Sequence, residues 1–189
     1  MDAHINYITT KISKSVSVLK RVKYTFPSDI LKSIYYSLIF PYYTYCNKVG
    51  GSAANVHLEL MIVLQKKAVR IISKTNYFEH TEPLFINLKL LSVDDIYKFS
   101  CIKFIYQCYN SNTYTYFRKR LRKNSEFHRY ETSSGDLLRL PNGRLKQFKN
   151  SFMENGIRLW NKLPSKTKTA PSIDVLKSQT KDLIFKRSL

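Results

Sequence analysis

Apolar residues recur every three or four positions over long stretches of this chain, and this spacing restricts it to helical folds. In the first stretch the steps are 3, 4, 4, 3 and 3, at Ile5, Ile8, Ile12, Val16, Leu19 and Val22. Side chains at such steps share one face of an α-helix. The pattern therefore predicts a helix over residues 5–22 with one buried face.

Four more helices are expected before the pattern breaks near residue 111. Ser28 is placed as the N-cap of the second, which Pro41 should end or kink because proline removes a hydrogen bond and clashes with the preceding turn. A short helix should follow Thr81, and another should follow the capping sequence from Ser92 to Asp95. A longer helix over residues 55–73 is expected to bury Leu58, Met61, Ile62, Gln65, Ala68, Val69 and Ile72.

Beyond residue 111 the chain is more irregular. Residues 127–131 and 137–140 could form short strands of a β-hairpin around a Ser-Ser-Gly turn. A helix is expected over residues 149–162, and a last one should start at Ser172. The fold class predicted is therefore mainly α, with a helical bundle over residues 1–111. A basic, partly irregular extension with two helices should follow over residues 112–189.

Positive charge dominates the composition and narrows the class of partner. The 189 residues include 32 Lys+Arg and 13 Asp+Glu, a net charge of +19. Residues 1–95 include 12 basic and 7 acidic residues, a net charge of +5. Residues 96–189 include 20 basic and 6 acidic residues, a net charge of +14. Such an excess repels itself unless a polyanion is near, which favours nucleic acid first and an anionic membrane surface second.

No bilayer-spanning segment is expected. The longest run without charge covers the fifteen residues 33–47 and contains Pro41. A span needs about 20 apolar residues. We therefore expect a soluble or peripheral protein of the cytoplasm or nucleus.

One basic segment is the best candidate for contacting phosphates. It contains five cations in six residues, Arg118, Lys119, Arg120, Arg122 and Lys123. Aromatic residues flank it on both sides, and Lys146 and Lys149 extend the charge. Cations neutralise phosphates, and aromatic faces can stack on unpaired bases. These seven basic residues form the predicted nucleic-acid site, and the alternative is a solvated loop without a partner.

No catalytic, metal or cofactor site is expected. The chain has no phosphate-binding glycine loop, no His/Cys spacing suited to zinc and no CxxC among its three cysteines. Asp94 and Asp95 could hold Mg²⁺, but their place before an amphipathic helix favours helix capping. Cys101 and Cys108 lie seven apart on one helix face, which favours core packing.

The region before Pro164 carries a glycine and the single tryptophan within one expected helix. Gly156 should be favoured there only if close packing requires it, since glycine costs about 1 kcal/mol relative to alanine in a helix. Trp160 is interpreted as a buried packing residue, with base stacking as the alternative.

Five stretches of the chain resemble the region that follows the catalytic core in non-LTR (LINE-type) retrotransposon reverse transcriptases. They keep the same order over about 160 residues. They are His4 to Lys14 with Val18-Leu19, Leu31 to Tyr45, Leu64 to Ile72, His80 to Phe85, and Phe152 to Pro164. One departure is Val49 before Gly50, near which the family pattern has tryptophan.

The resemblance implies a thumb-like helical region and a C-terminal extension that hold the template and primer of such a polymerase. The catalytic core and its metal-binding Asp-Asp motif would lie upstream, so the expected function is RNA and/or DNA binding by a catalytically incomplete fragment. The missing polymerase core is a further expected partner. The alternative is a structural or protein-interaction bundle, with the tyrosine-rich face of residues 35–45 as its docking surface.

Overall fold

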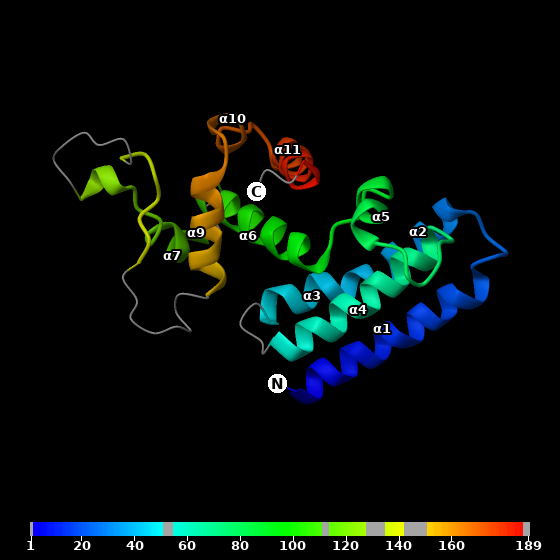
Figure 1. Ribbon diagram of the computed structural model, residues 1–189. Helices are drawn as coiled ribbons and strands as arrows, with labels where there is room; N and C mark the ends of the chain where they lie inside the picture. The colour runs from blue at the N-terminus through cyan, green and yellow to red at the C-terminus, as the bar shows by residue number, and fades with distance from the viewer. Residues whose placement is uncertain (1, 51–54, 111–113, 128–134, 142–150, 187–189) are drawn as a thin grey trace. The chain divides into compact units, whose positions relative to one another are not determined.

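The fold is mainly α-helical, as the periodicity predicts. The computed structural model describes residues 2–50, 55–110, 114–127, 135–141 and 151–186 (Figure 1). These ranges contain ten α-helices, one 3-10 helix and no β-strand. The α-helices are α1 (Asp2–Val22), α2 (Ser28–Leu38), α3 (Phe40–Gly50), α4 (Asn55–Ile72), α5 (Thr81–Asn87), α6 (Val93–Asn110), α7 (Thr115–Arg118), α9 (Phe152–Lys162), α10 (Ser165–Lys168) and α11 (Ile173–Phe185), and the 3-10 helix η2 is Asn124–Glu126.

Contacts divide the chain into two compact units. These are Met1–Tyr97 and Lys98–Leu189, so the division falls inside α6. The sequence pattern instead places a boundary at residue 111, where regular periodicity ends, and a functional division there stays a prediction. None of the helices in the described ranges combines the length and apolar character needed to cross a membrane.

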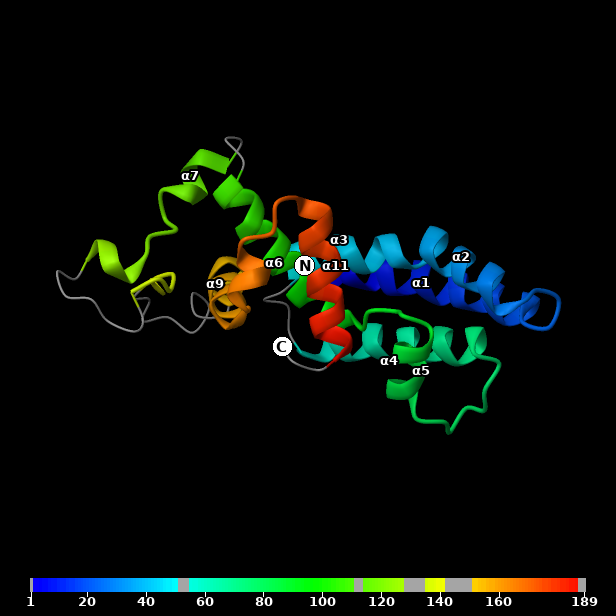
Figure 2. The ribbon, with the colours of Figure 1, turned by 90° about the horizontal axis from the view of Figure 1, so that it is seen from above.

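In the first unit, α1 packs against α2, α3 and α4, and α4 also contacts α5. Figures 1 and 2 show α1 and α4 running side by side. The predicted inner face of α1 is confirmed at Ile8, Ile12, Val16 and Leu19, which are buried. Val22 is half-buried, and the Ile5 side chain lies outside the described part of the chain.

Proline sets the boundaries of the next two helices. Pro27 is the N-cap of α2, one residue before the expected Ser28. The helix ends at Leu38, before Pro41 as expected. The chain then begins α3, a helix that the sequence pattern does not predict. Pro41 then lies in the first turn of α3, where a missing backbone N–H breaks no intrahelical hydrogen bond.

A buried glutamine ties α4 to its neighbours. The Gln65 Nε2 group donates to the Tyr35 hydroxyl and to the Leu91 carbonyl, both at 2.9 Å. Its Oε1 accepts the backbone N–H of Val93, also at 2.9 Å. The side chain is only 1% exposed, so these bonds join α4 to α2 and to the start of α6 without competition from water.

In the second unit, α9 packs closely on α6. A Cβ atom added to Gly156 would lie 3.0 Å from Ile105 Cγ1 and 3.4 Å from the Cys101 carbonyl oxygen. The expected close approach at this glycine is therefore confirmed. Trp160, one turn later, is 7% exposed and stacks on Tyr109 with ring centroids 6.2 Å apart.

The two cysteines of α6 are buried, as expected, and Cys108 lies in the core of the second unit, where it should make stability sensitive to alkali. Burial raises the pKa of the Cys108 thiol from 9.0 to about 11. The unfolded chain loses this proton at the lower pKa, so the folded form binds more protons between the two values. Rising pH then favours unfolding.

We expect this thiol alone to lower the free energy of unfolding by about 2 kcal/mol between pH 9 and 11. Urea titrations of the native chain and Cys108→Ala across this range measure it. The difference in free energy of unfolding between the native chain and Cys108→Ala should decrease as pH rises, because only the native chain carries the Cys108 thiol. A difference that stays constant from pH 8 to 11 would contradict the expectation, and buried tyrosines affect both chains equally.

Candidate nucleic-acid interface

The predicted basic segment is held to the core of the second unit by one apolar residue between its cations and one just before them. Leu121 is buried in that core, and the Phe117 ring packs against Phe104 with centroids 5.3 Å apart. The cations beside these anchors point outward. The exposed residues are Arg118, Lys119, Arg120 and Arg122.

Acidic neighbours neutralise one end of this segment but not the other. Lys123 Nζ lies 2.9 Å from an Asp136 carboxylate oxygen, and this hydrogen bond raises the pKa of Lys123 and lowers that of Asp136. The Lys123 backbone N–H also donates to Glu126. The four exposed cations before it form no ion pair with any residue in the described ranges.

Backbone pairing brings a further arginine to the segment. The Arg139 N–H donates to the Arg122 carbonyl at 2.8 Å, and the Asn124 N–H donates to the Leu137 carbonyl at 3.0 Å. One isolated antiparallel bridge joins Lys123 to Leu138. The strand expected over residues 137–140 is therefore wrong: these residues meet the basic segment itself. The other expected strand lies largely outside the described residues.

This pairing creates a surface of arginines and aromatic rings. The Arg139 and Arg122 guanidinium carbons lie 4.0 and 5.8 Å from the Phe127 ring centroid. Arg120 lies 4.9 Å from the centroid of Tyr116, whose side chain is 64% exposed. Sequence reasoning missed Arg139, because only the pairing of distant segments places it beside Arg122.

The other candidates from the sequence have different outcomes. Lys146 and Lys149 lie outside the described residues. Trp160 is buried, which supports the packing role and leaves no accessible face for a base. Ser92 caps α6: its hydroxyl accepts the Asp95 N–H at 3.2 Å and donates to the Asp95 carboxylate at 2.6 Å, so Asp95 takes part in the capping. In the described part of the chain, no three His, Cys, Asp or Glu side chains gather as metal ligands would.

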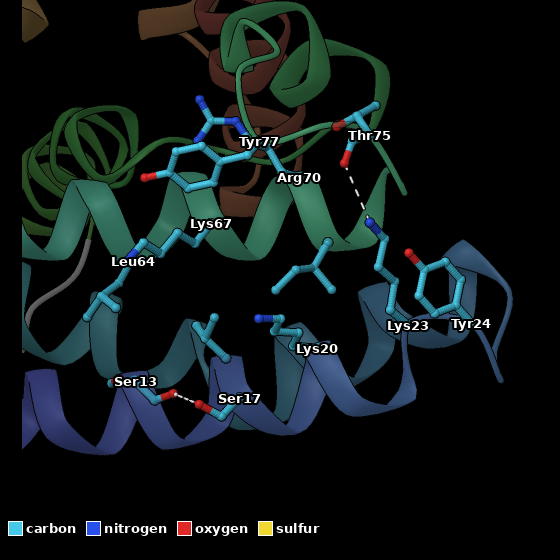
Figure 3. A pocket seen from close by; sticks show the side chains of 12 residues that line it. Ser13, Ser17, Lys20, Lys23, Tyr24, Leu64, Lys67, Arg70, Thr75 and Tyr77 are labelled. Carbon is cyan, nitrogen blue, oxygen red and sulfur yellow. Dashed lines mark hydrogen bonds between the residues drawn. The ribbon is translucent and has the colours of Figure 1, made fainter.

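The first unit contains a basic groove that sequence reasoning did not find. It lies between α1 and α4 and has a volume of about 570 Å³ (Figure 3). Its cations come from both helices, and none of the described residues that line it is acidic. They are Lys20 and Lys23 from the end of α1 and its following turn, and Lys67 and Arg70 from α4.

Two exposed tyrosines line this groove. Tyr24 and Tyr77 are 84% and 66% exposed. Lys23 Nζ lies 5.4 Å from the Tyr24 ring centroid, and the Arg70 guanidinium carbon lies 5.5 Å from that of Tyr77. The guanidinium is held in place because its Nε donates to the Glu79 carbonyl at 3.0 Å. The groove thus combines cations and aromatic faces in the described part of the first unit.

The signal for this groove in the sequence is weak because its residues are spread over some 60 positions. Each lysine reads there as an ordinary exposed residue of an amphipathic helix. Comparisons with protein-family models, curated proteins and solved structures find no match to this chain.

Proposed function

We propose that this protein binds RNA or DNA, and that Arg118, Lys119, Arg120 and Arg122 contact the phosphates. The observation that carries the proposal is the state of these four side chains. They are exposed, adjacent in sequence and without an acidic partner among the described residues. Cations gathered in this way repel one another, and binding a polyanion relieves the repulsion and releases counterions, both of which favour binding.

The rings beside these cations favour nucleic acid over other polyanions. Tyr116 and Phe127 are exposed, and each is approached by an arginine. Aromatic faces stack on unpaired bases, whereas a sulfated sugar has no aromatic ring to stack on them. Arg139 joins the proposed contact surface, while Lys123 contributes less because Asp136 already neutralises it.

In origin, we propose a fragment of a non-LTR retrotransposon reverse transcriptase, with the first unit as the thumb-like bundle. The proposal rests on the resemblance of five ordered stretches and on a helical fold compatible with it. The fragment would grip template and primer without performing phosphoryl transfer, which requires metal ions held by carboxylates. It would act in the cytoplasm or nucleus beside the polymerase core.

The salt dependence of binding tests the phosphate contacts. The slope of log K for binding against log salt concentration is negative, and each phosphate contact contributes roughly 0.7 to its magnitude on single strands and 0.9 on duplex DNA. Removing four contacts, in R118Q/K119Q/R120Q/R122Q, should therefore reduce the magnitude of the slope by about 3. Fluorescence anisotropy with labelled RNA and DNA oligonucleotides between 50 and 300 mM salt measures this slope.

A variant with the same change in net charge is the control. Lys14, Lys66, Lys166 and Lys181 are exposed and lie outside both the basic segment and the groove. Their fourfold replacement by glutamine should leave most of the slope intact. Equal losses in the two variants would show that total charge, not the basic segment, drives binding, and an unchanged slope in the first variant would remove the segment from the proposal.

One observation favours the second candidate, a protein-interaction bundle. On α2 and α3 the expected docking face divides in two: Tyr35, Ile39 and Tyr43 are fully buried, while Tyr36, Leu38 and Tyr45 are 40%, 43% and 55% exposed. Only the exposed half could dock a partner. Sedimentation at 1 M salt separates the candidates, because salt suppresses nucleic-acid binding but strengthens apolar self-association.

A further inference from the structure

We propose that the groove between α1 and α4 is a second nucleic-acid site, which binds a single strand with one base stacked on Tyr77. The inference rests on the proposed function and deepens it by assigning a strand type and a place on the first unit. Four features of the groove support it: its charge, its apolar lining residues, the exposed ring of Tyr77 and its size.

The charge of the groove suits a sugar-phosphate backbone. Lys20 and Lys67 are exposed on facing helices, and neither forms an ion pair or hydrogen bond with any described residue. In Figure 3 the Lys20 side chain extends from α1 toward α4. Among the described residues, Lys23 and Arg70 each donate a hydrogen bond to one backbone carbonyl, of Thr75 and Glu79 respectively, so both keep donors for phosphate oxygens.

Part of the lining of the groove is apolar, which distinguishes it from an ordinary charged helix face. Val16, Leu64 and Ile71 line it together with the cations. A sugar or base edge can pack against these apolar side chains while the phosphates contact the cations. A volume of about 570 Å³ lies in the range of about 300–1,000 Å³ typical of small-ligand pockets, and fits a short stretch of single strand, whereas a duplex is far wider.

Tyr77 is positioned to stack. Arg70 lies over its ring, and Phe78 meets it edge-on at 5.5 Å between centroids, so the ring is supported yet 66% exposed. Stacking requires an unpaired base, because the faces of paired bases are already covered in a duplex. The geometry therefore favours single strands over duplexes at this site.

The groove is best tested in the R118Q/K119Q/R120Q/R122Q background, which removes the contribution of the basic segment. In this background, Tyr77→Ala should weaken binding of a ten-nucleotide single strand by about fivefold or more, while leaving inorganic polyphosphate binding unchanged. K20Q/K67Q should weaken the binding of both ligands and reduce the magnitude of the salt slope for the single strand by about 1.4. Thermal unfolding followed by circular dichroism checks that each variant folds.

Matched controls lie beside each substituted residue. Phe78 is 90% exposed and does not line the groove, although its ring meets that of Tyr77, so Phe78→Ala should weaken binding less than Tyr77→Ala. Lys14 and Lys66 lie on the same helices as Lys20 and Lys67 but outside the groove, so K14Q/K66Q should change affinity less. Photocrosslinking of an oligonucleotide carrying 5-iodouridine should label the peptide that contains Tyr77.

The possible outcomes separate this inference from the proposed function. If the native chain binds no nucleic acid at all, the proposed function fails. If it binds but Tyr77→Ala and K20Q/K67Q match their controls, the groove alone is overturned. If the lysine pair matters and Tyr77 does not, or if duplex binds the groove as tightly as single strand, base stacking is overturned.

Discussion

Replacing Gln65 with methionine should lower the free energy of unfolding by about 3 kcal/mol or more. Methionine has a similar length and helix propensity but lacks the amide that hydrogen-bonds Tyr35, Leu91 and Val93 in the core of the first unit. The Tyr35 hydroxyl and the Leu91 carbonyl then lose a buried partner, and each such loss costs roughly 1–3 kcal/mol. Urea unfolding followed by circular dichroism at 222 nm measures the change.

The adjacent exposed residue provides the control. Lys66→Met introduces the same side chain on the same helix at the surface and should change stability by no more than about 0.5 kcal/mol. Tyr35→Phe removes only one of the three bonds and should fall between the two. If Gln65→Met is as stable as Lys66→Met, the buried hydrogen bonds do not hold α4 in place.

Loss of the Gln65 hydrogen bonds should also affect the groove, because α4 supplies Lys67 and Arg70. Binding measured in Gln65→Met should therefore be compared with that of the native chain under conditions where both remain folded. A loss of groove binding without unfolding would show that Gln65 helps to position the cationic side of the groove.

Truncating Trp160 to alanine should destabilise the second unit by about 3–5 kcal/mol, the typical cost of removing a large aromatic side chain from a core. The indole is 7% exposed, stacks on Tyr109 and contacts Tyr106, whose hydroxyl donates to the Ala170 carbonyl at 3.0 Å. Its loss leaves a cavity where α9 meets α6. The expected destabilisation is a large part of the free energy of unfolding of a typical domain, which is about 5–15 kcal/mol.

A surface aromatic of the same unit serves as the comparison. Tyr116→Ala should change stability by less than about 0.5 kcal/mol, although it should weaken nucleic-acid binding. Trp160→Phe should lie between the two. Trp160 is the only tryptophan of the chain, so its fluorescence in the native protein should be blue-shifted and resist quenching by iodide. Emission like that of free tryptophan would contradict the packing described.

The helices could be predicted well because their causes are local. Apolar steps of three and four place the buried faces of α1 and α4, and Ser92, Ser151 and Ser172 each accept an N–H of the first turn that follows. Even the glycine in α9 was informative, since a residue unfavourable in helices indicates close packing. Short helices such as α7 and α10 were missed, because one turn holds too few apolar residues to show a period.

The candidate site was only partly predictable. The run of cations at residues 118–123 is visible in the sequence. The pairing of Lys123 with Asp136 is not, because the two residues are thirteen positions apart and no periodicity of the sequence relates them. The same pairing of segments adds Arg139 beside Arg122. The expected hairpin placed residues 137–140 with the wrong partner, since turn residues indicate a reversal without specifying which strands meet.

From the sequence alone came the helical class, the limits of the long helices and the strong excess of positive charge, because each depends on composition or on neighbours within a few residues. Tertiary structure decided which cations remain unneutralised and which of them share a surface. The groove depends on α1 and α4 packing side by side, which brings Lys20 and Tyr24 opposite Lys67, Arg70 and Tyr77. Electrostatic and stacking interactions act over a few ångströms in space, so only the packed helices could bring these side chains together.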